Sequence, residues 1–236
     1  MNVVITGTNK GLGLCLLKVF AENGHKVVAG IYEKYNFSQV TEYIDNCKYK
    51  DNIILVPMDV SNEDMVKKAA EKSYINFGPI DVVINVAGIL LPTDRTDTIL
   101  NGDIDVLRKS IEINTIGTVI VMKHFYKYIK KDGTGIMIFV TSEAGSVTNS
   151  GSNFPAYSIS KAAANKAVFI LRSTVQNQVK VYAMHPGRMN TDMGKTTAQI
   201  EPEESAIGIY KIVTGETHIY HNTTGFINYK GEEMTI

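Results

Sequence analysis

The stretch that decides the fold is NVVITGTNKGLGLCLLKVFAENGHKVVAGI, residues 2–31. It predicts a strand over Asn2 to Thr6, a glycine-rich turn, a helix over Leu12 to Asn23 and a second strand over Lys26 to Ile31. This is the length of a β-α-β crossover, a connection that is almost always right-handed. The unit therefore predicts a doubly wound sheet, which binds ligands at the carboxyl ends of its strands.

The rest of the chain repeats this alternation of short β-branched runs and longer segments with helical periodicity. Further strands are expected at Asn52 to Pro57, Asp81 to Asn85, Gly135 to Thr141, Val179 to His185 and Gly225 to Asn228. Further helices are expected at Phe37 to Cys47, Asn62 to Phe77, Asp103 to Lys130, Ala156 to Gln176 and Pro202 to Val213. The order predicts an α/β protein in which residues 1–236 form one domain, a seven-stranded parallel sheet with helices on both faces.

Composition narrows the class of protein. Apolar residues make up 44% of the chain and charged residues 20%, which is typical of globular proteins and excludes a disordered chain. Lys+Arg and Asp+Glu both number 24, so no net positive charge attracts a nucleic acid. No apolar run approaches the roughly 18 residues of a membrane span. We expect a cytoplasmic protein with neither a nucleic-acid partner nor a membrane partner.

The cysteines and histidines predict no metal and no disulfide framework. Cys15 and Cys47 are too few for such a framework, and the five histidines lack zinc-site spacing with them. This pattern favours a reducing compartment.

The turn at residues 6–13, TGTNKGLG, has the composition of a phosphate-binding loop. Glycine lets the backbone turn sharply and approach a pyrophosphate, and the N–H groups and dipole of the helix N-terminus attract the anion. The glycines are separated by three residues and then by one, unlike the common G-x-G-x-x-G order. Taken alone, the motif is weak evidence, and a tight turn without a ligand is the alternative.

A second motif combines Ser142, Tyr157 and Lys161. The i,i+4 spacing of Tyr157 and Lys161 places phenol and ammonium on one helical face, where the ammonium is expected to lower the pKa of the phenol. Ser142 follows the fifth expected strand, so its hydroxyl can reach the same crevice. Tyr-x-x-x-Lys alone is common on solvated helices, but its position after a strand-end serine favours proton transfer by Tyr157.

These motifs together resemble the short-chain dehydrogenase/reductase family over essentially the whole chain, which implies a Rossmann-type fold. The family's glycine turn is similar to residues 6–13, its Asn-Asn-Ala-Gly to Asn85-Val86-Ala87-Gly88, and its Tyr-x-x-x-Lys to residues 157–161. The family's catalytic serine matches Ser142, and its active-site asparagine matches Asn114. The Pro-Gly that follows the family's sixth strand matches residues 186–187. Residues 185–193 and 225–231 resemble the carbonyl reductases related to sniffer and to C-factor. Val86 and Arg188 depart from the usual Asn and Trp.

The resemblance implies hydride transfer between a nicotinamide and a carbonyl or alcohol carbon. Tyr157 would be the general acid or base, Lys161 would lower its pKa and bind the ribose, Ser142 would hold the oxyanion, and Asn114 would bind a water that links Lys161 to solvent. The implied cofactor-binding residues are Gly7, Asn9, Lys10, Gly11, Leu12, Gly13, Asp59, Val60, Asn85, Ala87, Gly88, Tyr157, Lys161, Pro186, Gly187, Met189 and Thr191. For Asp59 an alternative is a carboxylate at a helix N-terminus, and for Thr191 it is helix capping.

Substrate and assembly are less constrained. The short segment between His185 and Pro202, where the family builds its substrate lid, predicts an open site for small or medium aldehydes, ketones or quinones. In this family the long helices commonly pack between subunits, which implies a homodimer or homotetramer. Two alternatives stay open: a non-catalytic NAD(P)-binding regulator, and a signalling protein resembling C-factor that needs only the bound cofactor.

The end of the second strand predicts the cofactor. NAD-specific sites place an acid there to bind the ribose 2′-OH, whereas this chain has Ile31 and Tyr32 and no acid before Glu33. Lys10 supplies an ammonium for a 2′-phosphate. We therefore expect NADP(H) to be preferred, with NAD(H) as the alternative if Glu33 reaches the ribose or if Lys10 is only a solvated loop charge.

Overall fold

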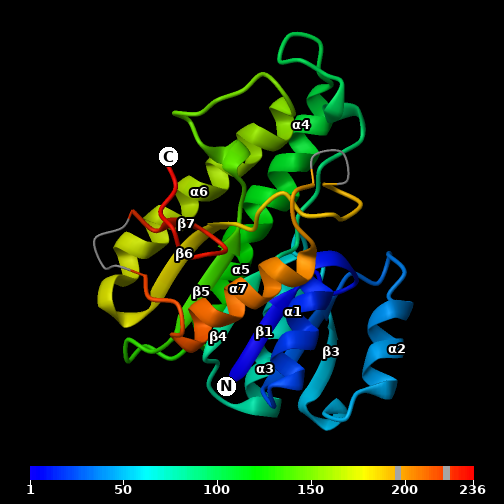
Figure 1. The fold of residues 1–236 in the computed structure, drawn as a ribbon, viewed down its shortest axis with the longest axis vertical. Coiled ribbons are helices and arrows are strands. Elements are labelled where there is room, and N and C mark those ends of the chain that lie inside the picture. The colour runs from blue at the N-terminus through cyan, green and yellow to red at the C-terminus, as the bar shows by residue number, and fades with distance from the viewer. Residues whose placement is uncertain (195–197, 220–223) are drawn as a thin grey trace.

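The computed structural model describes residues 1–194, 198–219 and 224–236. In these residues a parallel seven-stranded sheet has the order β3-β2-β1-β4-β5-β6-β7 (Figure 1). The strands are β1 (Asn2–Thr6), β2 (Lys26–Ile31), β3 (Ile53–Pro57), β4 (Val82–Asn85), β5 (Ile136–Val140), β6 (Lys180–His185) and β7 (Phe226–Asn228). Strand order reverses between β1 and β4, so their carboxyl ends flank the crevice in which such sheets bind ligands.

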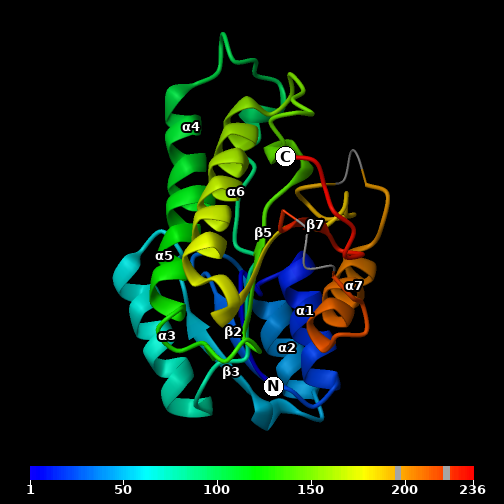
Figure 2. The same cartoon turned by 90° about the vertical axis from the view of Figure 1, so that its left-hand side faces the viewer.

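Helices cover both faces of the sheet (Figure 2). One face carries α1 (Gly11–Glu22), α2 (Ser38–Asn46) and α7 (Pro202–Thr214); the other carries α3 (Glu63–Phe77), α5 (Gly117–Phe125) and α6 (Pro155–Val175), with α4 (Ile104–Ile111) packed beside α6. Short 3₁₀ turns span Lys50–Asn52, Thr93–Arg95, Glu143–Gly145 and Gln176–Gln178. In the described part of the chain, no helix is both long and apolar enough to cross a bilayer.

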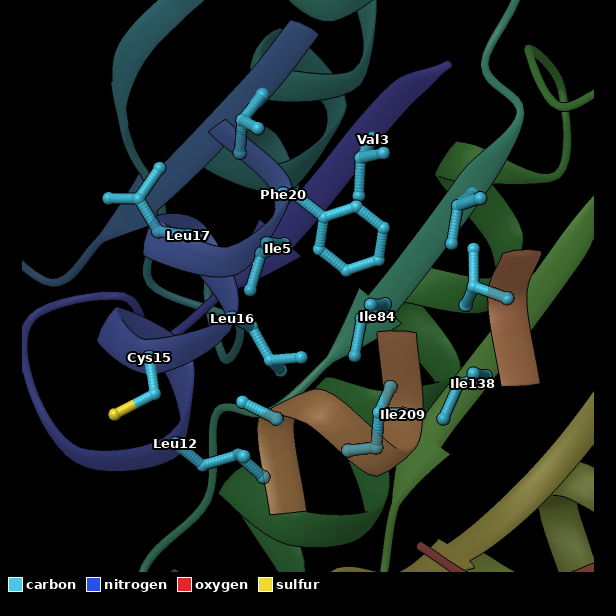
Figure 3. Close-up of a cluster of buried hydrophobic side chains, with 14 of the residues drawn as sticks. Val3, Ile5, Leu12, Cys15, Leu16, Leu17, Phe20, Ile84, Ile138 and Ile209 are labelled. Atoms are coloured by element: carbon cyan, nitrogen blue, oxygen red, sulfur yellow. The ribbon is translucent and has the colours of Figure 1, made fainter. Parts of the chain in front are cut away.

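The core follows from the alternation of side chains along the strands. Val3 and Ile5 of β1 pack with Phe20 of α1 on one face, as Figure 3 shows, whereas Val4 packs on the opposite face in the cluster that contains Phe139 of β5. Because both faces of a strand are buried, its sequence is apolar throughout, as expected for a parallel sheet. The sheet is thus packed between two hydrophobic clusters, one on each face, which fix the positions of the strand ends.

Strands and helices largely match the prediction. All seven predicted strands, and five of the six predicted helices, lie within one residue of their predicted ends. The single helix expected over Asp103 to Lys130 is wrong. Instead α4 is followed by a π-helical turn, Glu112–Ile116, and α5 ends at Phe125. Beyond it, the backbone of Ile80 pairs with the carbonyl of Tyr128 at 3.0 Å and the amide of Lys130 at 2.9 Å, which draws these residues out of the helix.

The glycine turn brings the start of α1 close to the end of β1. A Cβ on Gly13 would lie 2.1 Å from the carbonyl oxygen of Gly7, so no other residue fits without moving the turn. The amide and hydroxyl of Thr8 both donate to the carbonyl of Gly30 at 3.0 Å. The turn is therefore fixed to β2, with the N-terminus of α1 at the crevice.

Candidate active site

Ser142, Tyr157 and Lys161 converge at the carboxyl end of β5. Ser142 follows the strand and accepts a hydrogen bond from the amide of Ala144 at 3.1 Å, and its side chain lies close enough to the Tyr157 phenol to lower the pKa of that phenol. Lys161 is only 4% exposed, and its Nζ donates to the carbonyl of Val140 at 2.9 Å and lies 5.6 Å from the ring centroid of Tyr157. The structure thus brings together the three side chains that the sequence selected.

Burial dominates the titration of this group. It raises the pKa of the Tyr157 phenol, against a smaller lowering by the Ser142 hydrogen bond, and it lowers the pKa of Lys161 to about 8. The expected lowering of the Tyr157 pKa by Lys161 is not found, because the loss of hydration is the largest effect and the nearby Glu143 charge adds to it. In this structure Tyr157 is therefore held as a neutral phenol, which can donate a proton.

Asn114 lies in the π-helical turn, directly beside this group. Its Oδ1 accepts from the amide of Ile89 at 2.8 Å, and its Nδ2 donates to the carbonyl of Ile89 at 2.9 Å and to Ser160 Oγ at 3.0 Å. A Cβ on Gly88 would lie 3.1 Å from Asn114 Oδ1 and 3.2 Å from Lys161 Nζ. The glycine therefore allows the loop after β4 to pack against both side chains.

The loop after β4 is also tied to the glycine turn. Thr6 Oγ1 donates to Asn85 Oδ1 at 2.7 Å and accepts from the amides of Val86 and Ala87 at 3.1 and 3.0 Å. Asn85 Nδ2 donates to Thr118 Oγ1 at 3.1 Å. Asn85 thus holds the two loops together through its side chain, and Val86 does so through its backbone amide while its side chain packs against the core.

The segment after β6 crosses to the glycine turn from the other side. Lys10 Nζ pairs with Asp192 Oδ2 at 2.8 Å, and a Cβ on Gly11 would lie 3.4 Å from Thr191 Cγ2. Thr191 does not cap α7, which begins at Pro202 after Glu201. Met189 forms a bridge with Ile200, which anchors the segment that follows Pro186 and Gly187.

A cluster of cations and aromatic rings stands at the carboxyl end of β2. The Tyr32 and Tyr35 ring centroids are 5.6 Å apart, Lys10 Nζ lies 5.5 Å from the Tyr35 centroid, and Lys34 Nζ lies 6.0 Å from the Tyr32 centroid. The Asn9 side chain is occupied by hydrogen bonds to the protein backbone. Its Oδ1 accepts from the amide of Tyr32 at 2.8 Å, and its Nδ2 donates to the carbonyl of Tyr32 at 3.0 Å. Two ammonium groups therefore lie where sequence reasoning had identified only Lys10.

The residues after β3 form a separate turn. Asp59 Oδ1 accepts from the amide and the hydroxyl of Ser61 at 3.0 and 2.7 Å. The first turn of α3 is capped by Asn62, which accepts from the amide of Met65 at 3.0 Å. Asp59 is therefore not the N-terminal carboxylate of that helix. Val60 is buried against Gly117, where a Cβ would lie 2.9 Å from Val60 Cγ2.

A cavity of about 300 Å³ lies beside Glu143, the residue after Ser142, on the side of β6 and β7. At its edge, Arg188 Nε donates to Glu143 Oε1 at 2.6 Å, and the Glu143 amide donates to His185 Nδ1 at 3.2 Å. Burial lowers the pKa of His185, which keeps the ring neutral and able to accept that bond. Arg188, which stands where the family usually has Trp, thus makes this wall of the cavity polar, while His185 supports the loop.

Sequence reasoning missed Asp94 in the Thr93–Arg95 turn. Its carboxylate is 1% exposed and accepts from the amides of Ala156 and Tyr157 at 2.9 and 2.8 Å. One indirect signal existed, because Phe154 and Pro155 at the start of α6 supply no capping side chain. Nothing in the sequence, however, points to a residue some 60 positions earlier.

Comparison with known proteins agrees with this geometry. Residues 1–202 match the model of the short chain dehydrogenases, so the chain belongs to the short-chain dehydrogenase family and is an NAD(P)-dependent oxidoreductase. It is 28% identical to oxidoreductase BOA17 of Botryotinia fuckeliana over an alignment of 211 residues. This alignment covers 87% of this chain and 73% of that protein. An alignment of 249 residues with an uncharacterized oxidoreductase of Schizosaccharomyces pombe shows 27% identity and covers 96% of this chain and 94% of that protein.

Solved structures share the fold. Carbonyl reductase Sniffer of D. melanogaster has a TM-score of 0.89 at 23% identity, with 100% of both chains covered. The NADPH-bound carbonyl reductase from chicken fatty liver has a TM-score of 0.86 at 23% identity, with 99% of this chain and 93% of that chain covered. At these identities the likeness establishes the doubly wound architecture.

The described residues fit a nicotinamide dinucleotide. The close approach of Gly13 to Gly7 leaves backbone amides at the N-terminus of α1 for a pyrophosphate. Lys161 is a buried ammonium with three donors, of which the Val140 carbonyl takes one, so the others can serve ribose hydroxyls. Donor groups are thus present for the pyrophosphate and for a ribose of such a ligand.

Proposed function

We propose that this protein is an NADPH-dependent carbonyl reductase that acts on small or medium aldehydes, ketones or quinones. One observation carries the proposal: Ser142, Tyr157, Lys161 and Asn114 meet within a few ångströms beside Gly88, at the carboxyl ends of β4 and β5. The nicotinamide would supply or accept the hydride. The remaining chemistry falls to the side chains of this chain.

Tyr157 donates the proton in the proposed reduction. Its raised pKa keeps the phenol protonated, which suits a general acid, and Ser142 is placed to donate a hydrogen bond to the same carbonyl oxygen as negative charge develops. Lys161, with a pKa near 8, is mostly protonated at neutral pH and stabilises the phenolate that forms. Asn114 orders the loop around Lys161, where a water would reconnect the site to solvent.

The cofactor would lie across the glycine turn. We propose that residues 7, 9 and 11–13 hold the pyrophosphate, Lys10 holds the 2′-phosphate, and residues 59–60 hold the adenine. Residues 85, 87 and 88 would hold the adjoining ribose, and residues 186, 187, 189 and 191 the nicotinamide. Asn9 and Asn85 would act through the backbone they position, because their side chains are bonded to the protein. The NADPH-bound state of the chicken relative and the cluster at the end of β2 support NADP(H) over NAD(H).

A screen of substrates tests the proposal. Aldehydes, ketones and quinones would each be mixed with the protein and NADPH, and the loss of the absorbance of the reduced nicotinamide would be followed. Turnover of at least one class is expected. Binding of NADPH without turnover of any class would favour the alternative of a non-catalytic regulator.

Assembly and location complete the proposal. We propose that residues 1–236 act as one domain in a homodimer or homotetramer, supported by exposed apolar side chains on the outer helices, Ile104, Val119 and Ile170. Two free thiols, Cys15 and Cys47, support a reducing cytoplasmic location. We propose no membrane partner and no nucleic-acid partner. Light scattering on the purified protein tests the assembly.

A further inference from the structure

The helix that carries the catalytic tyrosine begins without a cap of its own. Phe154, which precedes Pro155, has a left-handed backbone with φ of 54° and makes no side-chain capping bond. The first amides of a helix lack partners within it, and when they are buried this lack is costly. The start of α6 therefore depends on a group from elsewhere in the chain.

Asp94 supplies that group. Oδ1 accepts from the amide of Ala156 at 2.9 Å and Oδ2 accepts from the amide of Tyr157 at 2.8 Å, so both carboxylate oxygens hold the first turn of the helix. Asp94 is only 1% exposed, so this contact is shielded from water. A buried negative charge at a helix N-terminus also interacts favourably with the helix dipole.

The neighbouring Arg95 extends the same contact. Its NH2 group donates to the carbonyl of Met193 at 2.6 Å, and its guanidinium lies 6.0 Å from the ring centroid of Phe154. The Thr93–Arg95 turn thus connects the loop after β4, the start of α6 and the segment after β6. These are three of the segments that surround the candidate site.

We propose that Asp94 is a positioning residue that sets the place of the Tyr157 hydroxyl through the backbone amide of Tyr157 itself. This inference rests on the proposed role of Tyr157 as proton donor. Asp94→Asn replaces one accepting oxygen by a donor that faces an N–H group, so the start of α6 must shift. Because a misplacement of about 1 Å can cost about 10² in rate, kcat should fall by about tenfold or more.

A double-mutant cycle with Tyr157→Phe separates positioning from general loss of structure. Asp94→Asn should lower kcat about tenfold in the wild-type background and less than about twofold in the Tyr157→Phe background, with NADPH affinity within about threefold in both. Asp132→Asn is the matched control, because Asp132 also accepts a backbone amide, that of Thr134, but at the amino end of β5. It should leave kcat unchanged.

The outcomes are distinct. Equal losses of kcat in both backgrounds, or no loss in the wild type, would overturn the positioning role of Asp94. If Asp94→Asn does not fold, Asp94→Glu, which displaces the carboxylate by one methylene, enters the same cycle with the same criterion. If Tyr157→Phe alone retains wild-type kcat, the proposed role of Tyr157 fails and this inference fails with it.

Discussion

Lys10 offers a sharp test of cofactor choice, because the structure shows what competes for its charge. Lys10 Nζ is paired with Asp192 at 2.8 Å, with the two side chains 54% and 63% exposed. Such exposed pairs contribute at most about 1 kcal/mol. A charge-assisted bond from Lys10 to a 2′-phosphate would contribute about 1 to 3 kcal/mol. With about 2 kcal/mol for that bond and about 0.5 kcal/mol for the pair it displaces, the net preference is about 1.5 kcal/mol.

This balance predicts opposite effects from the two partners. Lys10→Ala should lower the ratio of kcat/KM for NADPH to that for NADH about five- to thirtyfold, since about 1.4 kcal/mol corresponds to a factor of ten. Asp192→Asn should raise the ratio by up to about fivefold, because the competing carboxylate is removed. The assay is steady-state kinetics with both cofactors, at one ionic strength and with one carbonyl substrate.

Lys48→Ala is the matched control for these kinetics. Its Nζ lies 5.4 Å from the ring centroid of Tyr49, much as Lys10 Nζ lies 5.5 Å from that of Tyr35, but Lys48 precedes β3 at the other end of the sheet. Its cofactor ratio should equal that of the wild type. Equal or better use of NADH by the wild type, or an unchanged ratio in Lys10→Ala, would refute the reasoning.

Two further predictions concern the glycine turn and the buried lysine. Gly13→Ala should weaken NADPH binding while circular dichroism stays native, because the new Cβ would meet the Gly7 carbonyl at 2.1 Å; unchanged affinity would place the cofactor elsewhere. Burial lowers the Lys161 pKa from 10.5 to about 8, so the folded state binds fewer protons than the unfolded state between these values and stability rises with pH there, by about 2 kcal/mol from about pH 8 to about pH 10. Chemical denaturation at pH 8 and 10 should show this gain in wild type relative to Lys161→Met, and parallel curves would argue against a buried charge.

The fold was largely predictable because its signals are local. Apolar runs such as Val3 to Ile5 are short and bounded by turn residues, so each strand could be placed from its own sequence. The π-helical turn at Glu112–Ile116 left no such signal, since five residues are too few to change the apolar periodicity of the helix around them. One long helix was therefore predicted where the chain forms two.

The site was predictable only where residues act through a motif. Tyr157 and Lys161 are four positions apart and Ser142 follows a strand, so their convergence follows from the fold. The pairing of Lys10 with Asp192 and the capping of α6 by Asp94 join residues far apart in the chain, and no spacing rule connects them. The Tyr157 pKa also depends on burial, which only the packed structure reveals.

The most direct test of the proposed mechanism is kcat for Tyr157→Phe, measured with NADPH binding titrated on the same sample. The substitution keeps the ring and removes only the hydroxyl, which lies beside Ser142. The account predicts a fall in kcat of about 10² to 10⁴, the usual contribution of one positioned acid, with NADPH affinity nearly intact. A variant that binds NADPH normally and keeps more than about a tenth of wild-type kcat would contradict it.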